Sequence, residues 1–465
     1  MAHAYGNFLR RHEPDSPLPA IATALVLTLG FGISMAASLP GYLSYDSVIQ
    51  LLEGRTGIYS GWHPPIMSWL LGLGDAVIPG TALFVAGNAL LLLGAMLLLL
   101  RIARPVSWLA VPCALFCVLT PQFVLYQGTV WKDVLFANAA VAAFATLTHA
   151  VAGQNADRLR WLPAGAAFLL LCLAALVRQN GFLLLPFGGL ALAWMAIRSG
   201  MARGRAILMG ASAVVSSLVI VWMTNAALAL RIPDDGGAAK QLRLLEFYDL
   251  AGAFADDPAL DSPALRQRDS KLFERLKHDG AQLYSPVRSD TLARSAPLQL
   301  ALAEAPENVL HKPWLEFVFS KPGTYLRHRA EIFRWVVRTP QIGACVPFIV
   351  GVRGPSGPLA ELGLKARFSQ RDRMANWYGR RLVGTSIFSH LTFLVLSLCE
   401  VAFLLYRRCA TDLPWICLLG GSIVFSLSFF FLSLACDYRY LYLLDLSALA
   451  TLYWVCLRPR RAVGG

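Results

Sequence analysis

The stretch "LPAIATALVLTLGFGISMAASL", residues 18–39, decides the fold class of this chain. About 20 apolar residues in a helix are enough to cross the hydrocarbon core of a bilayer, and this run has that length. It follows Arg10 and Arg11, as a signal sequence would, but it exceeds the roughly 7 to 15 apolar residues of a signal core. We therefore predict that it is an uncleaved first transmembrane span.

The remainder of the chain repeats this pattern. Hydrophobic residues make up 56% of the 465 residues and charged residues only 15%, which is far outside the average of soluble proteins. We predict an all-α polytopic membrane protein with about ten transmembrane helices. The nine further apolar runs lie near residues 81–100, 106–125, 133–152, 161–177, 181–197, 206–230, 384–405, 413–435 and 440–457.

The segment 64–80 is shorter than these runs. It begins with Pro64 and Pro65 and contains Asp75, so we expect it to lie on the interface or to dip into it, not to cross the membrane.

The net charge of +13 follows the expected topology. Fourteen arginines fall in loops on alternate turns of the chain, which the positive-inside rule assigns to the cytoplasm together with both termini. They are Arg10, Arg11, Arg101, Arg104, Arg158, Arg160, Arg198, Arg203, Arg205, Arg407, Arg408, Arg458, Arg460 and Arg461. Because topology accounts for the charge, we expect no nucleic-acid partner.

The opposite, outer face collects polar motifs at the ends of helices. Asp46 and His63 follow the first span, and the motifs "YQGTVWKD" (126–133), "VRQNGF" (177–182) and "CDYRYLYLLD" (436–445) belong to the same face. A charge costs roughly 2.5 to 3.5 kcal/mol at the centre of a membrane helix, so ionisable residues in such positions are candidate functional residues.

Each charged residue of these motifs also has a structural explanation. Lys132 and Arg178 could extend their charged groups to the lipid head groups, and Asp133 could stabilise the N-terminus of the next helix. Arg439 could form a structural ion pair with Asp437 or Asp445.

The first outer loop has structural explanations as well. His63 could end a turn before Pro64, and Asp46 or Ser47 could cap a short helix. The coincidence of five polar patches on one face favours function over five separate structural roles.

The only large hydrophilic segment divides the chain into three parts. We expect a seven-span module over 1–230 with its first outer loop at 40–80, a mostly helical extracytoplasmic domain over 231–383, and three spans over 384–465. Within the middle part, residues 313–338 have helical periodicity interrupted at Pro322, and their aromatic and basic residues favour a helix on the membrane surface. Residues 351–363 are rich in Gly and Pro, which indicates a flexible link.

The nine cysteines show no metal-type spacing and no disulfide framework. Most lie inside apolar runs, where a cysteine packs as a small hydrophobic residue. These are Cys113, Cys117, Cys172, Cys399, Cys417 and Cys456.

The order of the motifs resembles that of the membrane-embedded C-type (GT-C) glycosyltransferases, which include protein O-mannosyltransferases and the aminoarabinose transferase of lipid A. The likeness is nearest to a bacterial branch of these proteins. The motifs that carry it are "DS..Q" (46–50), "HPP" (63–65), "WKD" (131–133), "RQNG" (178–181), "YDLAG" (248–252) and "DYRYLY" (437–442).

The resemblance implies transfer of a sugar from a polyprenyl-phosphate carrier to an envelope glycan, lipid or protein, outside a bacterial plasma membrane. It places Asp46 at the position of the acid that acts on the acceptor. In the mannosyltransferases this acid is followed by Glu, whereas Asp46 is followed by Ser47. This difference leaves open the donor sugar and whether a divalent metal ion is bound; no other cofactor is implied.

The residue types fit this chemistry without the resemblance. Displacing a phosphate from a sugar carbon needs a base for the acceptor proton and cations for the departing phosphate. We predict Asp46 as the base and Lys132, Arg178 and Arg439 as the phosphate-binding cations. The remaining candidates for binding sugar hydroxyls or orienting the base are His63, Asp133, Asn180, Tyr438 and Tyr440.

Two questions stay open at this stage. A single attack by the acceptor gives inversion at the sugar carbon, whereas two flanking carboxylates could support a retaining route. A transporter or flippase for lipid-linked glycans could use the same cations without chemistry, although such proteins usually carry charges near the membrane midplane.

Overall fold

The computed structural model describes residues 16–152, 161–233, 237–339 and 342–458. Within them the chain is built from helices joined by loops, with four isolated β-bridges and no extended strand. The expectation of an all-α protein is confirmed.

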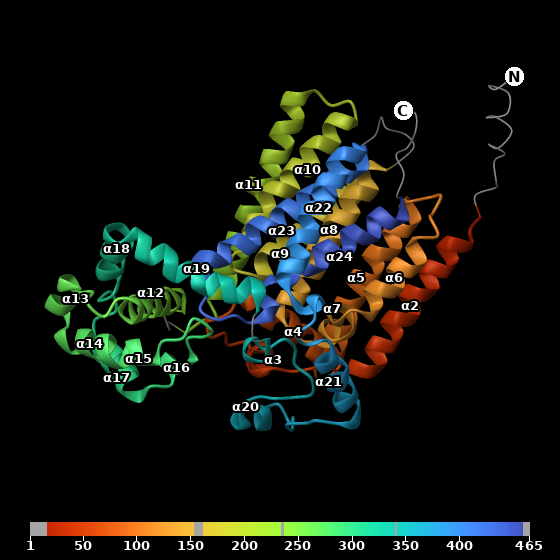
Figure 1. Ribbon diagram of the computed structural model, residues 1–465. Coiled ribbons are helices and arrows are strands. Elements are labelled where there is room, and N and C mark those ends of the chain that lie inside the picture. The colour runs from red at the N-terminus through yellow and green to blue at the C-terminus, as the bar shows by residue number, and fades with distance from the viewer. Residues whose placement is uncertain (1–15, 153–160, 234–236, 340–341, 459–465) are drawn as a thin grey trace, which may run out of the picture.

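A tilted bundle of apolar helices forms the larger part of the molecule (Figure 1). Eight helices of the described residues are long and apolar enough to cross a membrane, and a ninth span is the bent pair Ala110–Leu119 and Pro121–Gly128, with an angle of 61°. A tenth apolar helix, α9, has 17 residues, so about ten spans agrees with the structure. The helices of the bundle are α2 (Leu18–Ser38), α5 (Ala82–Ile102), α6 (Ala110–Leu119), α7 (Pro121–Val124), η1 (Tyr126–Gly128), α8 (Lys132–Val151), α9 (Trp161–Val177), η2 (Gly181–Leu184), α10 (Leu185–Arg198), α11 (Arg203–Ala229), α22 (His390–Arg407), η6 (Ala410–Asp412), α23 (Leu413–Leu432), η7 (Tyr438–Leu441) and α24 (Tyr442–Leu457).

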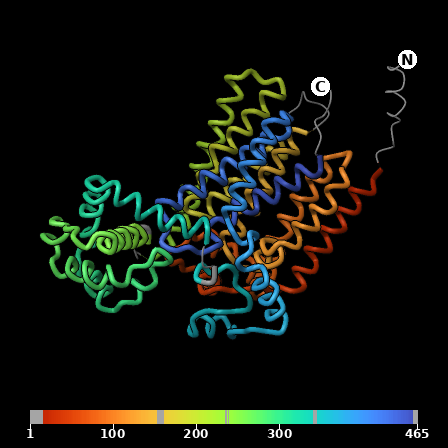
Figure 2. The backbone as a smooth tube through the Cα atoms, viewed as in Figure 1, coloured from red at the N-terminus to blue at the C-terminus, as the bar shows by residue number. Residues whose placement is uncertain are grey.

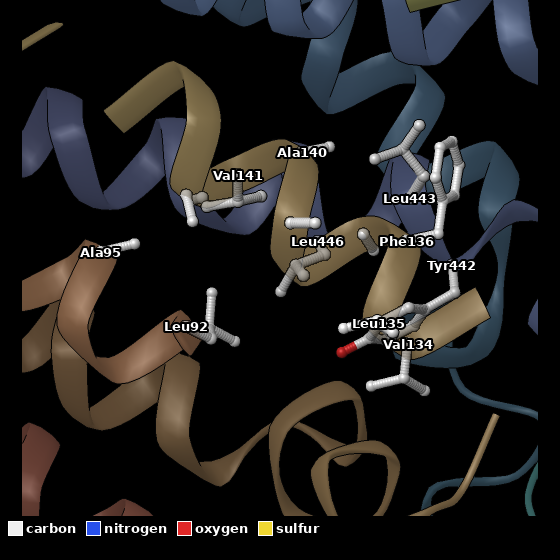
Figure 3. Close-up of a cluster of buried hydrophobic side chains, with 14 of the residues drawn as sticks. Leu92, Ala95, Val134, Leu135, Phe136, Ala140, Val141, Tyr442, Leu443 and Leu446 are labelled. Carbon is white, nitrogen blue, oxygen red and sulfur yellow. The ribbon is translucent and has the colours of Figure 1, made fainter. Parts of the chain in front are cut away.

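Helix α8 lies at the centre of the bundle. It packs against α5, α9 and α24, and nearly all of its side chains are buried. Its sequence is rich in alanine, and small residues let membrane helices approach closely where apolar lipid gives no hydrophobic driving force. Figure 3 shows part of the resulting core, to which Phe136 and Val141 of α8, Leu446 of α24 and Leu92 of α5 belong.

Two short helices, α3 (Tyr45–Thr56) and α4 (Pro65–Val77), lie across the lower end of the bundle in Figure 1. At about 1.5 Å per residue the 13 residues of α4 are too short to cross a bilayer, as expected for this segment. The two helices touch through glycine, since a Cβ atom on Gly54 would come within 2.1 Å of the carbonyl oxygen of Ser68. A forked ion pair of Arg55 with Asp75, at 2.7 and 2.8 Å, fixes their register.

The basic loops gather at the other end of the bundle. Arg458 donates to the carbonyl oxygens of Ile102 and Arg104, and Arg407 donates to the carbonyl oxygen of Arg458. Six of the fourteen arginines used to predict the topology lie outside the described residues: Arg10, Arg11, Arg158, Arg160, Arg460 and Arg461.

Residues 237–338 form a separate outer lobe with its own hydrophobic core, seen on the left in Figures 1 and 2. It consists of α12 (Gly237–Asp256), α13 (Pro263–Arg268), α14 (Ser270–Arg275), η3 (Leu276–Gly280), α15 (Ala281–Leu283), α16 (Asp290–Ala293), α17 (Ala296–Glu304), α18 (His311–Ser320) and α19 (Pro322–Arg338). The predicted break at Pro322 is confirmed. Arg329 of α19, one of the basic residues that we expected on the membrane surface, is instead fully buried, where Asp249 of α12 neutralises it at 2.6 Å.

The buried group around Asp249 joins the lobe to the bundle, and we call it the clasp. Asp249 accepts a hydrogen bond from Trp314 at 2.8 Å and faces His328 at 2.9 Å, while Arg329 donates to the carbonyl oxygen of Ser433. The segment after Ser433 also pairs with the lobe through the backbone of Val287 and Ser289.

Two sequence predictions for the outer face are wrong. Cys345 and Cys436 form a disulfide, 91 residues apart in the chain, although the spacing of the cysteines gave no sign of one. The predicted link 351–363 is ordered against α3: Val352 bridges Leu43 and Arg367, and Arg55 donates to the carbonyl oxygen of Leu362. This part of the chain holds η4 (Ile342–Cys345), α20 (Ser356–Glu361), α21 (Gln370–Leu382) and η5 (Ser386–Phe388).

Candidate active site

Asp46 lies in the first turn of α3, and the local sequence fixes its position. Ser44 caps the helix in a capping box with Ser47, so neither Asp46 nor Ser47 is the cap that the sequence suggested. Ser47 donates to the carbonyl oxygen of Val130 at 2.6 Å, and Trp131 donates to Ser44 at 3.0 Å. These bonds hold the start of α3 against the start of α8 and leave the Asp46 side chain free to meet other groups.

Four of the predicted residues meet in one chain of contacts. The Asp46 carboxylate binds Arg439 at 2.8 Å, and Nε2 of His63 lies 3.9 Å from the same carboxylate. Nδ1 of His63 lies 3.1 Å from Nζ of Lys132. Residues from α3, the loop before α4, α8 and η7 therefore form one charged cluster.

Arg178 extends the cluster from the end of α9. It forms an ion pair with Asp133 of α8, and Asn180 accepts a hydrogen bond from its Nε at 3.4 Å. Asn180 in turn donates to Ser428 at 2.9 Å. Asp133 and Asn180 thus orient a cation; no contact of the described residues places them against Asp46.

Aromatic rings connect the two arginines. The guanidinium of Arg178 lies 5.7 Å and that of Arg439 5.9 Å from the ring centre of Tyr440. Arg439 also lies 5.2 Å from the ring of Trp131. Such cation–π contacts stabilise a buried positive charge without neutralising it, which leaves the arginines attractive to an anion.

Tyr438 is the exception among the predicted residues. It is fully buried and its hydroxyl donates to Asp445 at 2.7 Å, away from the charged cluster. Asp445 pairs with His390 at 2.7 Å, so of the two partners proposed for Arg439 only Asp437, at 3.5 Å, is in contact with it.

Two groups of the first outer loop have shifted pKa values. Burial raises the pKa of Asp46, but the nearby His63 ring and the charge of Arg439 outweigh it, so that this pKa falls well below its usual range. Burial and the charge of Lys132 lower the pKa of His63. Asp46 is therefore ionised and His63 neutral at pH 7, with Nδ1 accepting from Lys132 and the Nε2 proton facing Asp46.

Asp437 behaves in the opposite way. Burial raises its pKa more than Arg439 and Arg288 lower it, and the charge of Asp46 adds to the rise. Arg439 thus shares its charge unequally between two carboxylates, and Asp46 is the stronger partner. Sequence reasoning named Asp437 only as an alternative structural partner; its position two residues before Arg439 was the available signal.

The carboxylates of the site do not fit a divalent metal ion. Arg439 occupies the position between Asp46 and Asp437, and two further cations, Lys132 and Arg178, belong to the same cluster. In the described part of the chain, no group of three or more His, Cys, Asp or Glu residues has metal-binding geometry. A metal ion would have to displace a guanidinium from its carboxylates in a positively charged environment.

Comparison with known proteins gives similarity in structure alone. No family model and no curated protein matches the sequence. The oligosaccharyltransferase of Archaeoglobus fulgidus matches over 92 to 93% of this chain at 13% identity, with TM-scores of 0.42 in the apo form and 0.41 in the form with zinc and sulfate. ArnT from Cupriavidus metallidurans, bound to undecaprenyl phosphate, matches 94% of this chain and 77% of its own at 14% identity, with a TM-score of 0.34.

This chain spans about half the length of the oligosaccharyltransferase chains, 48 to 50%. At TM-scores below 0.5 the similarity supports no functional argument. The function must be argued from the charged cluster.

Proposed function

We propose that this chain is an integral membrane glycosyltransferase of the GT-C type, which moves a sugar from a polyprenyl-phosphate carrier to an acceptor hydroxyl. The observation that carries the proposal is the Asp46–Arg439 ion pair with Lys132 beside it. A carboxylate that can act as a base, together with several cations at the end of a membrane bundle, suits a substrate that joins a sugar to a lipid phosphate.

Lys132 is the best candidate for the first contact with the donor phosphate. Among the described residues its hydrogen-bond partner is the neutral ring of His63, and no carboxylate lies within ion-pair distance of it. Arg178, in contrast, is paired with Asp133. A phosphate next to Lys132 would therefore gain an ion pair with an ammonium group that no carboxylate of the site neutralises.

Arg439 links donor binding to activation of the base. While it binds Asp46, the carboxylate is a weak base because its pKa is low. The donor phosphodiester carries one negative charge, as the carboxylate does, and further charge builds up as polyprenyl phosphate leaves, so it can compete for the same guanidinium. As Arg439 turns to the phosphate, the pKa of Asp46 rises and its carboxylate becomes able to accept a proton.

The transfer step then needs no further reactant. The acceptor oxygen forms a bond to the anomeric carbon as its proton passes to Asp46, and the bond from that carbon to the phosphate oxygen breaks. Polyprenyl phosphate leaves as an anion held by Lys132 and Arg439. A single displacement of this kind inverts the configuration of the sugar carbon.

The extracytoplasmic side suits the site best. The Cys345–Cys436 disulfide lies directly before Asp437 and Arg439 in the chain, and disulfides persist in oxidising compartments. The arginine-rich loops lie at the other end of the bundle, as the positive-inside rule requires of the cytoplasmic side.

Release of polyprenyl phosphate from a panel of polyprenyl-phosphate sugars tests the proposal. Purified wild type and Asp46→Asn are compared in detergent, with an envelope extract as the source of acceptors. Asp261→Asn is the matched control, because Asp261 is an exposed carboxylate of the outer lobe paired with Arg266. We expect release by wild type and by the control but not by Asp46→Asn. Donor binding without release by any variant would favour a carrier of lipid-linked glycans.

A further inference from the structure

A cavity of about 520 Å³ opens in the outer lobe between α12 and α19, lined by charged side chains and by small apolar residues. Ligand cavities in proteins are typically about 300 to 1,000 Å³, so this one can hold a small ligand. It lies apart from the charged cluster of Asp46, and none of its lining residues belongs to that cluster. The proposed transfer reaction gives it no role.

The charges around the cavity cancel. Arg327 lies 3.8 Å from Asp256, and Arg334 lies 2.9 Å from Glu331. Each guanidinium at the cavity therefore has a carboxylate near it, and these exposed pairs leave no net charge that would select an anionic or a cationic ligand. A neutral ligand with many hydroxyl groups can instead donate to the carboxylates and accept from the guanidinium groups while the pairs stay intact.

Small residues leave room in the cavity. Gly252 and Ala255 on α12 and Ala330 on α19 line it and project no long side chain. A Cβ atom on Gly252 would come within 2.1 Å of the His328 ring, so only glycine lets the two helices come this close. Tyr284 lines the cavity as well and adds an aromatic side chain beside which a sugar can pack.

The cavity is connected to the charged cluster through the clasp. His328 lines the cavity and faces Asp249 at 2.9 Å, and its neighbour Arg329 donates to the carbonyl oxygen of Ser433. Ser433 begins the segment that holds Cys436 and leads to Arg439. A ligand in the cavity therefore touches the element that sets the position of the outer lobe relative to Arg439.

We infer that this cavity binds a neutral carbohydrate, and that it holds the glycan part of the acceptor at a distance from the reacting hydroxyl. The second half of this statement rests on the proposed transferase function; the binding of a neutral sugar does not.

Saturation-transfer NMR with the purified full chain tests the binding directly. The probes are short neutral oligosaccharides of glucose, mannose and galactose, together with oligosaccharides of uronic acids as charged counterparts. Ala330→Trp places a large ring at an exposed position that lines the cavity, and Ala259→Trp, at an exposed position outside the cavity, is its matched control. Arg334→Ala removes a guanidinium from the rim, and Arg294→Ala, which is 83% exposed, is the control.

We expect at least one neutral oligosaccharide to bind wild type, with affinity reduced at least tenfold in Ala330→Trp and Arg334→Ala but unchanged in both controls. Absence of binding to wild type, binding of the uronic-acid probes alone, or equal binding to Ala330→Trp would overturn the inference. Polyprenyl phosphate release is measured on the same samples. Sugar binding with no release from any donor contradicts the transferase proposal and leaves the carbohydrate site standing.

Discussion

The charged cluster and the clasp use the same residue types for different purposes. In the clasp, Asp249 is fully buried and satisfied by Arg329, His328 and Trp314 at 2.6 to 2.9 Å. In the cluster, Asp46 is 27% exposed and bound by Arg439, with His63 only at 3.9 Å. A buried carboxylate with all its hydrogen-bond partners in place stabilises the fold. A part-exposed carboxylate that shares its arginine, with an unpaired lysine nearby, can give up that arginine to a substrate.

The largest difference between the two regions should come from removing the carboxylate charge of the cluster. Asp46→Asn should lower turnover by about 10²- to 10⁴-fold, the usual contribution of a general base, because the amide cannot take the acceptor proton. Thermal unfolding should change less than for the matching substitution in the clasp, since the Asp46 side chain is part-exposed and that of Asp249 is buried. Steady-state rates and melting curves of the same preparation check both halves; a rate within tenfold of wild type would contradict the assignment of the base.

The equivalent change in the clasp should act on stability instead. Asp249→Asn leaves Arg329 buried without its counter-charge, and breaking a buried pair in this way costs about 3 to 5 kcal/mol. Hydrogen exchange should show loss of protection in α12 and α19. Normal protection in the lobe would show that the clasp is not what holds it.

Removal of the Lys132 charge should affect substrate binding more than turnover. Lys132→Met deletes a charged hydrogen bond to the donor phosphate, worth about 1.5 to 3 kcal/mol, so KM for the donor should rise by about tenfold or more. Lys312→Met, an exposed lysine of the lobe, is the matched control. Unchanged KM with reduced kcat would argue against a role in phosphate binding.

The dependence of the rate on pH should be flat on the acid side. The folded pKa of Asp46 is depressed, so the free enzyme keeps this base ionised until the pH falls through that low value, below the ordinary value of about 3.9 for Asp. We expect kcat/KM to show no acid limb from Asp46 between pH 8 and 5. An acid limb with a midpoint above pH 5 that disappears in Asp46→Asn would contradict the low pKa.

The smallest effect should be that of chelators. Because Arg439 occupies the space between Asp46 and Asp437, incubation with EDTA followed by desalting should leave the rate unchanged. Loss of activity that returns with a divalent cation would show that a metal ion takes part after all.

Much of the site could be predicted from the sequence because topology alone brings helix ends together. Lys132, Arg178 and Arg439 each lie at the end of an apolar run on alternate turns of the chain, so counting spans places them on one face with Asp46. Counting the spans did not require the exact bounds of the helices.

The sequence did not predict the details that depend on local backbone geometry. Tyr438 shares a motif with Arg439 and Tyr440, but the 3-10 turn Tyr438–Leu441 points it toward Asp445 on the inner side. A short polar motif gives no indication of which of its members face the site.

The sequence did not predict pairs of residues far apart in the chain, for another reason. Cys345 ends the short helix η4 and Cys436 stands 91 residues later in a different part of the chain, so no spacing rule joins them. Arg329 likewise has its partner Asp249 80 positions earlier, and its place in an amphipathic helix suggested a surface residue.

The most direct test of the central claim is a cryo-EM structure of Asp46→Asn bound to a polyprenyl-phosphate sugar. The account predicts that the phosphate lies within hydrogen-bond distance of Lys132 and Arg439, about 3 Å, with the sugar carbon facing the substituted side chain at position 46. A phosphate bound elsewhere in the bundle, with Arg439 still directed at position 46, would contradict it.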